Sequence, residues 1–140
     1  MLRVFHGFII MLFFFLGHFS LNAICDKDAD SINPRKNKLN SWVLESQLKS
    51  HHVFYLSYSF WIICILLSHF YWVLYDSLLI PLLISFAVLA SHFYSFLSLE
   101  LKGKAPMDLI LNQASFGVIA PLYTIENFSG LSLFPLNGLF

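Results

Sequence analysis

The stretch SHFYWVLYDSLLIP, residues 68–81, contains Asp76, the only formally charged side chain between Lys49 and Glu100. Asp76 divides a long apolar segment into residues 53–75 and 77–99, each of 23 residues. A helix of that length measures about 34 Å at ~1.5 Å per residue, which fits the ~30 Å hydrocarbon core of a bilayer. One unbroken helix through Asp76 would measure about 70 Å, which no bilayer matches. We therefore predict a transmembrane helical hairpin over residues 53–99.

The residues around the division favour a turn. Asp76 and Ser77 carry side chains that compete for backbone hydrogen bonds, which is typical of turns and helix starts. Pro81 then falls in the first turn of the second helix, where its missing N–H costs little. An acid inside a membrane is a functional candidate by default. At this position, however, Asp76 is predicted to mark the tip of the hairpin.

The composition places the chain in a membrane. It is 58% hydrophobic and 11% charged, with a mean hydropathy of +0.72, whereas soluble domains carry roughly 25% charged residues. The expected fold class is therefore all-α integral membrane, multi-pass, with the lipid bilayer as the main partner. The formal net charge is zero and the basic residues form no long block, so nucleic acid is excluded as a partner.

Residues 1–25 have two interpretations. As an N-terminal membrane helix, the segment is long enough to cross the bilayer, although Gly7 and Gly17 weaken it. As a signal peptide, it has Arg3 as a minimal basic start, an apolar centre, and a small-x-small cleavage pattern that ends at Cys25. Both interpretations stay open at this point.

The remaining segments are more polar or shorter. Residues 26–52 form a polar basic loop, with a candidate interfacial helix that starts near Ser41. Residues 100–108 form a second basic loop. In residues 109–140, the apolar run 109–125 is a candidate short fourth helix at the lower limit for a span, and the rest is predicted to be an irregular tail.

Basic residues predict the orientation. Lys and Arg are enriched in short cytoplasmic loops, and the Asp76 turn carries none. With a hairpin between them, the two basic loops fall on one side of the membrane and Asp76 on the other, which favours an uncleaved first helix with its N-terminus outside. The residues concerned are Lys27, Arg35, Lys36, Lys38, Lys49, Lys102 and Lys104.

Small side chains recur at helical spacing on both halves of the hairpin. Such stripes let transmembrane helices approach closely. The alternative is a chance scatter of serines in a serine-rich chain. The predicted helix-packing residues are Ser57, Cys64 and Ser68 on the first half, and Ala87, Ser91 and Ser95 on the second.

Two histidines are weak candidates for cofactor binding. If residues 4–24 span the membrane, His18 and His92 lie at matched depth, about seven residues from the basic side. Two imidazoles at equal depth on two helices can ligate a haem. The simpler interpretation is that they make interhelical hydrogen bonds, worth about 0.6 kcal/mol each.

No catalytic or metal-binding pattern occurs in the sequence. It contains no glycine-rich phosphate loop, no HExxH and no CxxC. Glu100, Asp108 and Glu126 fall at predicted helix ends, where charges are expected at a membrane boundary. We predict that the protein is not an enzyme and binds no metal.

Four functional hypotheses remain. The favoured one is a non-catalytic accessory subunit with a membrane protein partner. A haem-binding membrane anchor that uses His18 and His92 is the first alternative. A channel or transporter component would need oligomerisation, because the predicted helices form no polar pathway. The last hypothesis is the product of a T-rich open reading frame without selected function, since such codons specify apolar residues, including the 16 phenylalanines.

Overall fold

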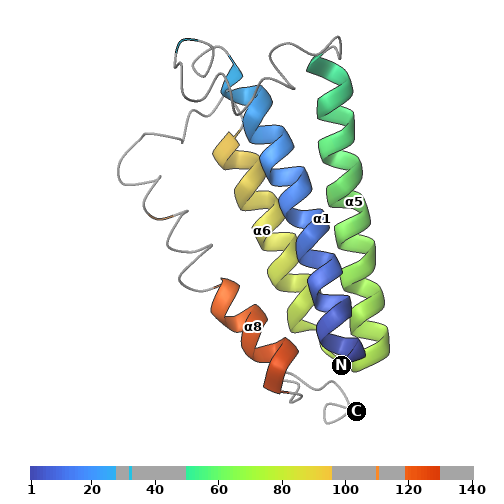
Figure 1. Ribbon diagram of the computed structural model, residues 1–140. Helices are drawn as coiled ribbons and strands as arrows, with labels where there is room; N and C mark the ends of the chain where they lie inside the picture. The colour runs from blue at the N-terminus through green and yellow to red at the C-terminus, as the bar shows by residue number, and fades with distance from the viewer. Residues whose placement is uncertain (28–31, 33–49, 96–109, 111–118, 130–140) are drawn as a thin grey trace.

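The computed structural model describes residues 1–27, 32, 50–95, 110 and 119–129. Within these residues the chain is all-helical and contains no strand, as predicted for the fold class. The helices are α1 (Leu2–Cys25), α5 (Ser50–Tyr75), α6 (Leu79–Ser95) and α8 (Ala120–Ser129). Helices α1, α5 and α6 run alternately up, down and up, and the shorter α8 covers one end (Figure 1). The candidate interfacial helix at Ser41 and the loop 100–108 lie outside the described residues.

The turn at Asp76 joins α5 to α6. Helix α5 ends at Tyr75, where the sequence predicts an end, and α6 begins at Leu79, two residues later than predicted. Asp76 adopts a φ of 52°, and its amide donates a 2.8 Å hydrogen bond to the carbonyl of Trp72. The left-handed region is more accessible to Asp and Asn than to other residues with a side chain. Asp76 is therefore the residue that reverses the chain.

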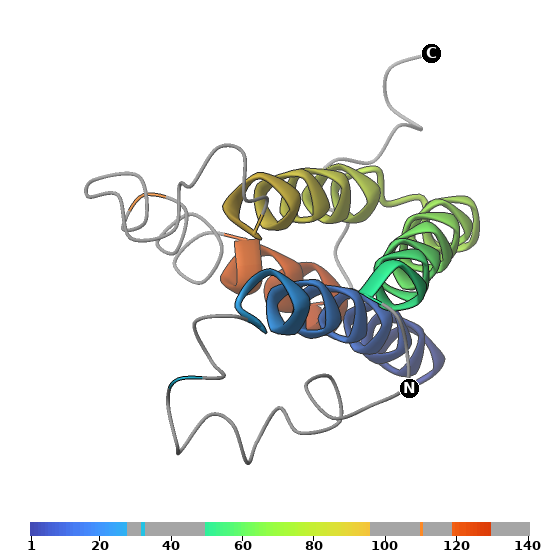
Figure 2. The same cartoon turned by 90° about the horizontal axis from the view of Figure 1, so that it is seen from above.

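Helix α1 packs most extensively against α5, and α6 completes the bundle. Seen along the bundle axis, α8 lies between α1 and α6, on the side away from α5 (Figure 2). Buried residues on α1 recur at steps of three, four or seven, which is the spacing of nearly antiparallel helices in left-handed packing. The buried residues are Gly7, Ile10, Gly17, Ser20, Leu21, Ala23 and Ile24.

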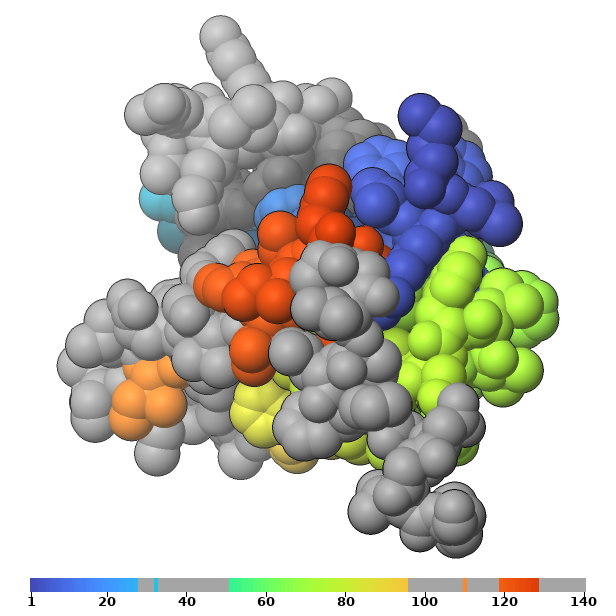
Figure 3. All heavy atoms as spheres, turned by 90° about the horizontal axis from the view of Figure 1, so that it is seen from below, coloured from blue at the N-terminus to red at the C-terminus, as the bar shows by residue number. Residues whose placement is uncertain are grey.

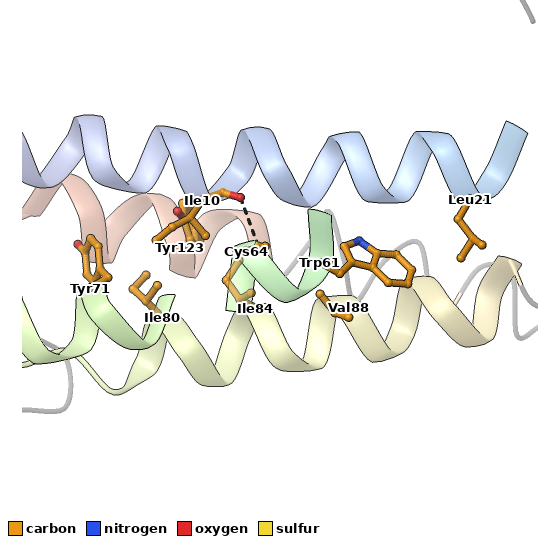
Figure 4. Packing of buried hydrophobic residues seen from close by; sticks show 9 residues of the cluster. All are labelled: Ile10, Leu21, Trp61, Cys64, Tyr71, Ile80, Ile84, Val88 and Tyr123. Atoms are coloured by element: carbon orange, nitrogen blue, oxygen red, sulfur yellow. Dashed lines mark hydrogen bonds between the residues drawn. The ribbon is translucent and has the colours of Figure 1, made fainter. Parts of the chain in front are cut away.

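The hydrophobic core is formed by all four helices. Its buried members lie between the ribbons in Figure 4, with Trp61 and Cys64 from α5 opposite Ile84 and Val88 from α6. Tyr123 brings α8 into the same cluster. The core therefore depends on α8 as well as on the three longer helices.

Helix α8 differs from the segment predicted near the C-terminus. The sequence predicts a helix over 109–125 followed by an irregular tail, but α8 continues to Ser129, four residues past Ile125. Glu126 and Asn127 are both buried. These two polar side chains pack inward. Their buried backbone N–H and C=O groups need hydrogen-bond partners, which a continued helix provides.

Large apolar side chains cover the outside of the bundle, and small and polar side chains are buried beside its hydrophobic core. Ser57, Ser68 and Ser77 are at most 1% exposed, and Glu126 is fully buried. Many large apolar side chains are at least 42% exposed, including Phe5, Phe8, Leu12, Phe19, Leu56, Ile62, Leu66, Phe70, Val73, Leu74, Leu82, Phe86, Leu89 and Phe93. Large exposed apolar surface and buried polar side chains are the two features that water disfavours in a globular protein.

Candidate functional site

A buried ion pair joins the first turn of α1 to α8. Nη2 of Arg3 lies 3.0 Å from Oε1 of Glu126. The Glu126 side chain is 0% exposed and that of Arg3 is 17% exposed. A carboxylate at this depth requires a charged partner, since its desolvation costs several kcal/mol. The interpretation of Glu126 as an ordinary boundary charge was therefore wrong.

Helix α5 provides the other contacts of the Arg3 guanidinium. Nε of Arg3 donates a 2.7 Å hydrogen bond to the hydroxyl oxygen of Tyr71. The guanidinium carbon also lies 5.7 Å from the ring centroid of Tyr71 and 5.7 Å from that of Tyr75, within the range of cation–π attraction. A planar guanidinium with several donors suits such a site better than an ammonium group does. Arg3 thus connects α1, α5 and α8.

Two further side chains of α8 contact the backbone of α1. The Tyr123 hydroxyl donates a 2.6 Å hydrogen bond to the carbonyl oxygen of Gly7. The hydroxyl is the donor in this contact because a backbone carbonyl oxygen can only accept. The amide of Asn127 donates to the carbonyl of Tyr123 at 2.8 Å, and its side chain occupies the space that a Cβ on Gly7 would take. A side chain at position 7 would therefore meet the movable amide end of Asn127 on α8.

His6 extends this cluster with an aromatic surface. Its ring centroid lies 5.3 Å from that of Tyr71 and 5.9 Å from those of Phe70 and Tyr75. We refer to Arg3, His6, Tyr71, Tyr75, Tyr123, Glu126 and Asn127 as the polar cluster. Figure 3 shows this end of the bundle, with α8 seated beside the start of α1.

The predicted helix-packing residues are all buried. Two of those on α5, Cys64 and Ser57, lie against α1. The Cys64 thiol donates to the carbonyl of Ile10 at 3.3 Å, as drawn in Figure 4. A Cβ on Gly17 would lie 3.0 Å from the carbonyl oxygen of Ser57. The exposed fractions are 0% for Ser57, Cys64 and Ser68, 4% for Ala87, 7% for Ser91 and 5% for Ser95.

His18 and His92 each contact an aromatic side chain. The ring of His18 stacks on Phe14 of its own helix, with centroids 6.1 Å apart. Nδ1 of His92 lies 3.1 Å from the hydroxyl of Tyr58, so α6 contacts α5 at this point. The haem site at His18 and His92 stays a prediction. Within the described residues, no group of three or more His, Cys, Asp or Glu side chains gathers in a way that would hold a metal ion.

The sequence contained one signal for the polar cluster that our interpretation did not use. Tyr123, Glu126 and Asn127 are spaced i, i+3 and i+4, so they share one face of a helix. Arg3 gave no comparable signal, because 123 residues separate it from Glu126. Only the fold brings the two charges together.

The chain matches no protein-family model, no curated protein and no solved structure.

Proposed function

We propose that the chain is a multi-pass integral membrane protein in which α1, α5 and α6 cross the bilayer. The observation that carries this proposal is the number of large apolar side chains that face outward, while serines and Glu126 are buried. Lipid is as apolar as leucine, so helices in a bilayer associate through small residues and hydrogen bonds rather than through large apolar ones. The side chains that would be unfavourable in water are then in their preferred solvent.

Length and burial support the same proposal. Helices α1 and α5 are long and apolar enough to span a bilayer by length and composition. Only 33% of the most apolar window of α1 and 28% of that of α5 are buried in the bundle. The core helix of a soluble protein would be mostly buried. Helix α6 is described over 17 residues, the lower limit for a span.

The proposed topology puts the N-terminus and Asp76 on the outer side. Because Glu126 pairs with Arg3, α8 also ends on that side, so the chain crosses the membrane once more between segment 100–108 and Ser129, in addition to the spans α1, α5 and α6. The basic segments 26–52 and 100–108 then lie on the cytoplasmic side, in agreement with the positive-inside rule. Arg3 is a basic residue on the outer side, but its charge is paired with Glu126. This pairing reduces the conflict between Arg3 and the rule.

Alkaline carbonate extraction of membranes that contain the full chain tests this proposal. We expect the protein to stay in the membrane pellet at high pH and to enter solution only with detergent, because three spans bury their apolar surface in lipid. Release into the carbonate supernatant, in the manner of a peripheral protein, would overturn the membrane assignment.

Within the membrane, we propose a non-catalytic role as an accessory subunit. The polar cluster of the described residues is used in helix packing, and the outer face of α6 presents apolar side chains such as Phe86, which is 54% exposed. A photoreactive phenylalanine analogue at position 86 tests this role in native membranes. We expect an adduct with a membrane protein in addition to lipid adducts, whereas lipid adducts alone would contradict a subunit role.

A further inference from the structure

We propose that α8 is a C-terminal strap that locks α1 into the bundle through the Arg3–Glu126 pair. The ion pair measures 3.0 Å, and its carboxylate is fully buried. Next to it, the Tyr123 hydroxyl contacts the carbonyl of Gly7 at 2.6 Å. The strap therefore recognises α1 by charge and by backbone contact, and not by apolar area alone.

The order of synthesis gives the strap its role. Arg3 enters the membrane with α1, and its carboxylate partner is made 123 residues later. Among the described residues outside α8, the contacts of the guanidinium are the Tyr71 hydroxyl and the rings of Tyr71 and Tyr75 on α5. Docking of α8 therefore supplies the carboxylate that pairs with Arg3, after α1, α5 and α6 have been made. A chain that ends before Glu126 lacks this step.

The strap also decides between the two interpretations of residues 1–25. A cleaved leader would remove Arg3, Gly7 and Ile10, and with them the groups that α8 and Cys64 contact. A strap that fits α1 this closely implies that α1 is retained as a permanent helix. This inference rests on the proposed function, because an unpaired Arg3 is unfavourable in the apolar surroundings of a membrane.

A disulfide between positions 7 and 127 measures docking directly. The Cβ that Gly7 lacks would lie 2.7 Å from Cγ of Asn127, so cysteines at both positions come within reach of a disulfide. The pair Gly7→Cys and Asn127→Cys is placed in the full chain with Cys25→Ala and Cys64→Ala. After oxidation in membranes, trypsin releases residues 4–27 linked to residues 105–140, which mass spectrometry identifies. With Arg3→Glu the first peptide begins at residue 1 instead, and with Glu126→Arg the second begins at residue 127.

The charges are then varied in this background. We expect Glu126→Arg or Arg3→Glu alone to slow disulfide formation by about tenfold or more, and the double exchange to restore much of the rate. Glu126→Gln, which keeps the shape of the side chain, is expected to slow it by a smaller factor. Asp76→Asn is the matched control, a carboxylate at the same end of the bundle, and is expected to leave the rate unchanged.

Two results would overturn the strap. One is a disulfide that forms equally fast with Glu126→Arg and without it, and the other is a double exchange no faster than the single variants. Carbonate extraction of the same samples separates the two proposals. If the strap proposal is wrong, the protein stays in the pellet and the rate of disulfide formation does not depend on the charges at positions 3 and 126. If the membrane assignment is wrong, the protein is released into the supernatant at any rate of disulfide formation.

Discussion

At the residue scale, Arg3 shows how the bundle accommodates a charge near its end. Desolvation of a guanidinium and a carboxylate costs several kcal/mol for each ion, and close pairing with added hydrogen bonds offsets that cost. Arg3 has both, since it contacts Glu126 at 3.0 Å and the Tyr71 hydroxyl at 2.7 Å. The Arg3 side chain also remains 17% exposed, so it is less completely desolvated than Glu126.

Gly17 and Gly7 are predicted to differ in their tolerance of a methyl group. In Gly17→Ala, the added Cβ would lie 2.5 Å from Cδ1 of Trp61 and 3.0 Å from the backbone oxygen of Ser57, which cannot rotate away. We expect this variant to lower the free energy of unfolding by about 1–3 kcal/mol, although alanine favours helix by about 1 kcal/mol.

Gly7→Ala is the matched comparison, because its Cβ would meet the movable amide end of Asn127. We expect a smaller loss for this variant. Unfolding in detergent micelles, followed by circular dichroism against denaturant, measures both. A loss at Gly7 equal to or larger than that at Gly17 would contradict the proposed packing of α1 on α5.

At the scale of elements, the α5–α6 turn depends on one residue in a left-handed conformation. Asp76 has a φ of 52°, which costs most residues with a side chain roughly 1–2 kcal/mol, and glycine almost nothing. We therefore expect Asp76→Gly to raise the stability by about 0.5–1 kcal/mol and Asp76→Asn to leave it nearly unchanged. Asp76→Val should lower it, because a β-branched residue is strained at positive φ.

The same unfolding measurement compares these three variants. Since the expected order follows from backbone conformation alone, it would be contradicted if Asp76→Asn caused a severe loss of folding. That result would instead assign the carboxylate charge an essential role.

The elements could be predicted in part from the sequence. The position of Asp76 between two apolar runs predicted the end of α5 at the correct residue, because a charge and a turn-forming pair coincide there. The contact face of α1 could not be predicted in this way. Gly7 and Gly17 were interpreted as weakening the helix, whereas both are buried contact points. Hydropathy ranks such residues low, although close approach between helices requires them.

At the scale of the whole molecule, the arrangement of side chains is consistent with lipid as the solvent. Buried Ser57 and Ser68 bond to backbone carbonyls of their own helix, and the buried Trp61 and Cys64 bond to carbonyls of α1. Large apolar side chains such as Ile62 and Leu66 point outward. The interior is thus held together by close contact and hydrogen bonds.

The polar cluster shows the limit of prediction from one sequence. Its members on α8 share a helical face and were open to prediction, but the meeting of residue 3 with residue 126 is a property of the tertiary fold. A charged residue at a predicted helix end is compatible both with a hydrated membrane boundary and with a buried ion pair. Burial distinguishes the two, and burial depends on what α8 packs against.

The central claim, that the exposed apolar face of the bundle is covered by lipid, is tested most directly by cysteine labelling. In the full chain with Cys25→Ala and Cys64→Ala, single cysteines replace Leu2, His51 or Ile62, all exposed in the bundle. A membrane-impermeant maleimide is applied to sealed vesicles from either side. We predict that positions 2 and 51 react from opposite sides, and that position 62, near the centre of α5 and 59% exposed, reacts only after denaturation. Labelling of position 62 in the native protein as fast as position 51 would contradict the account.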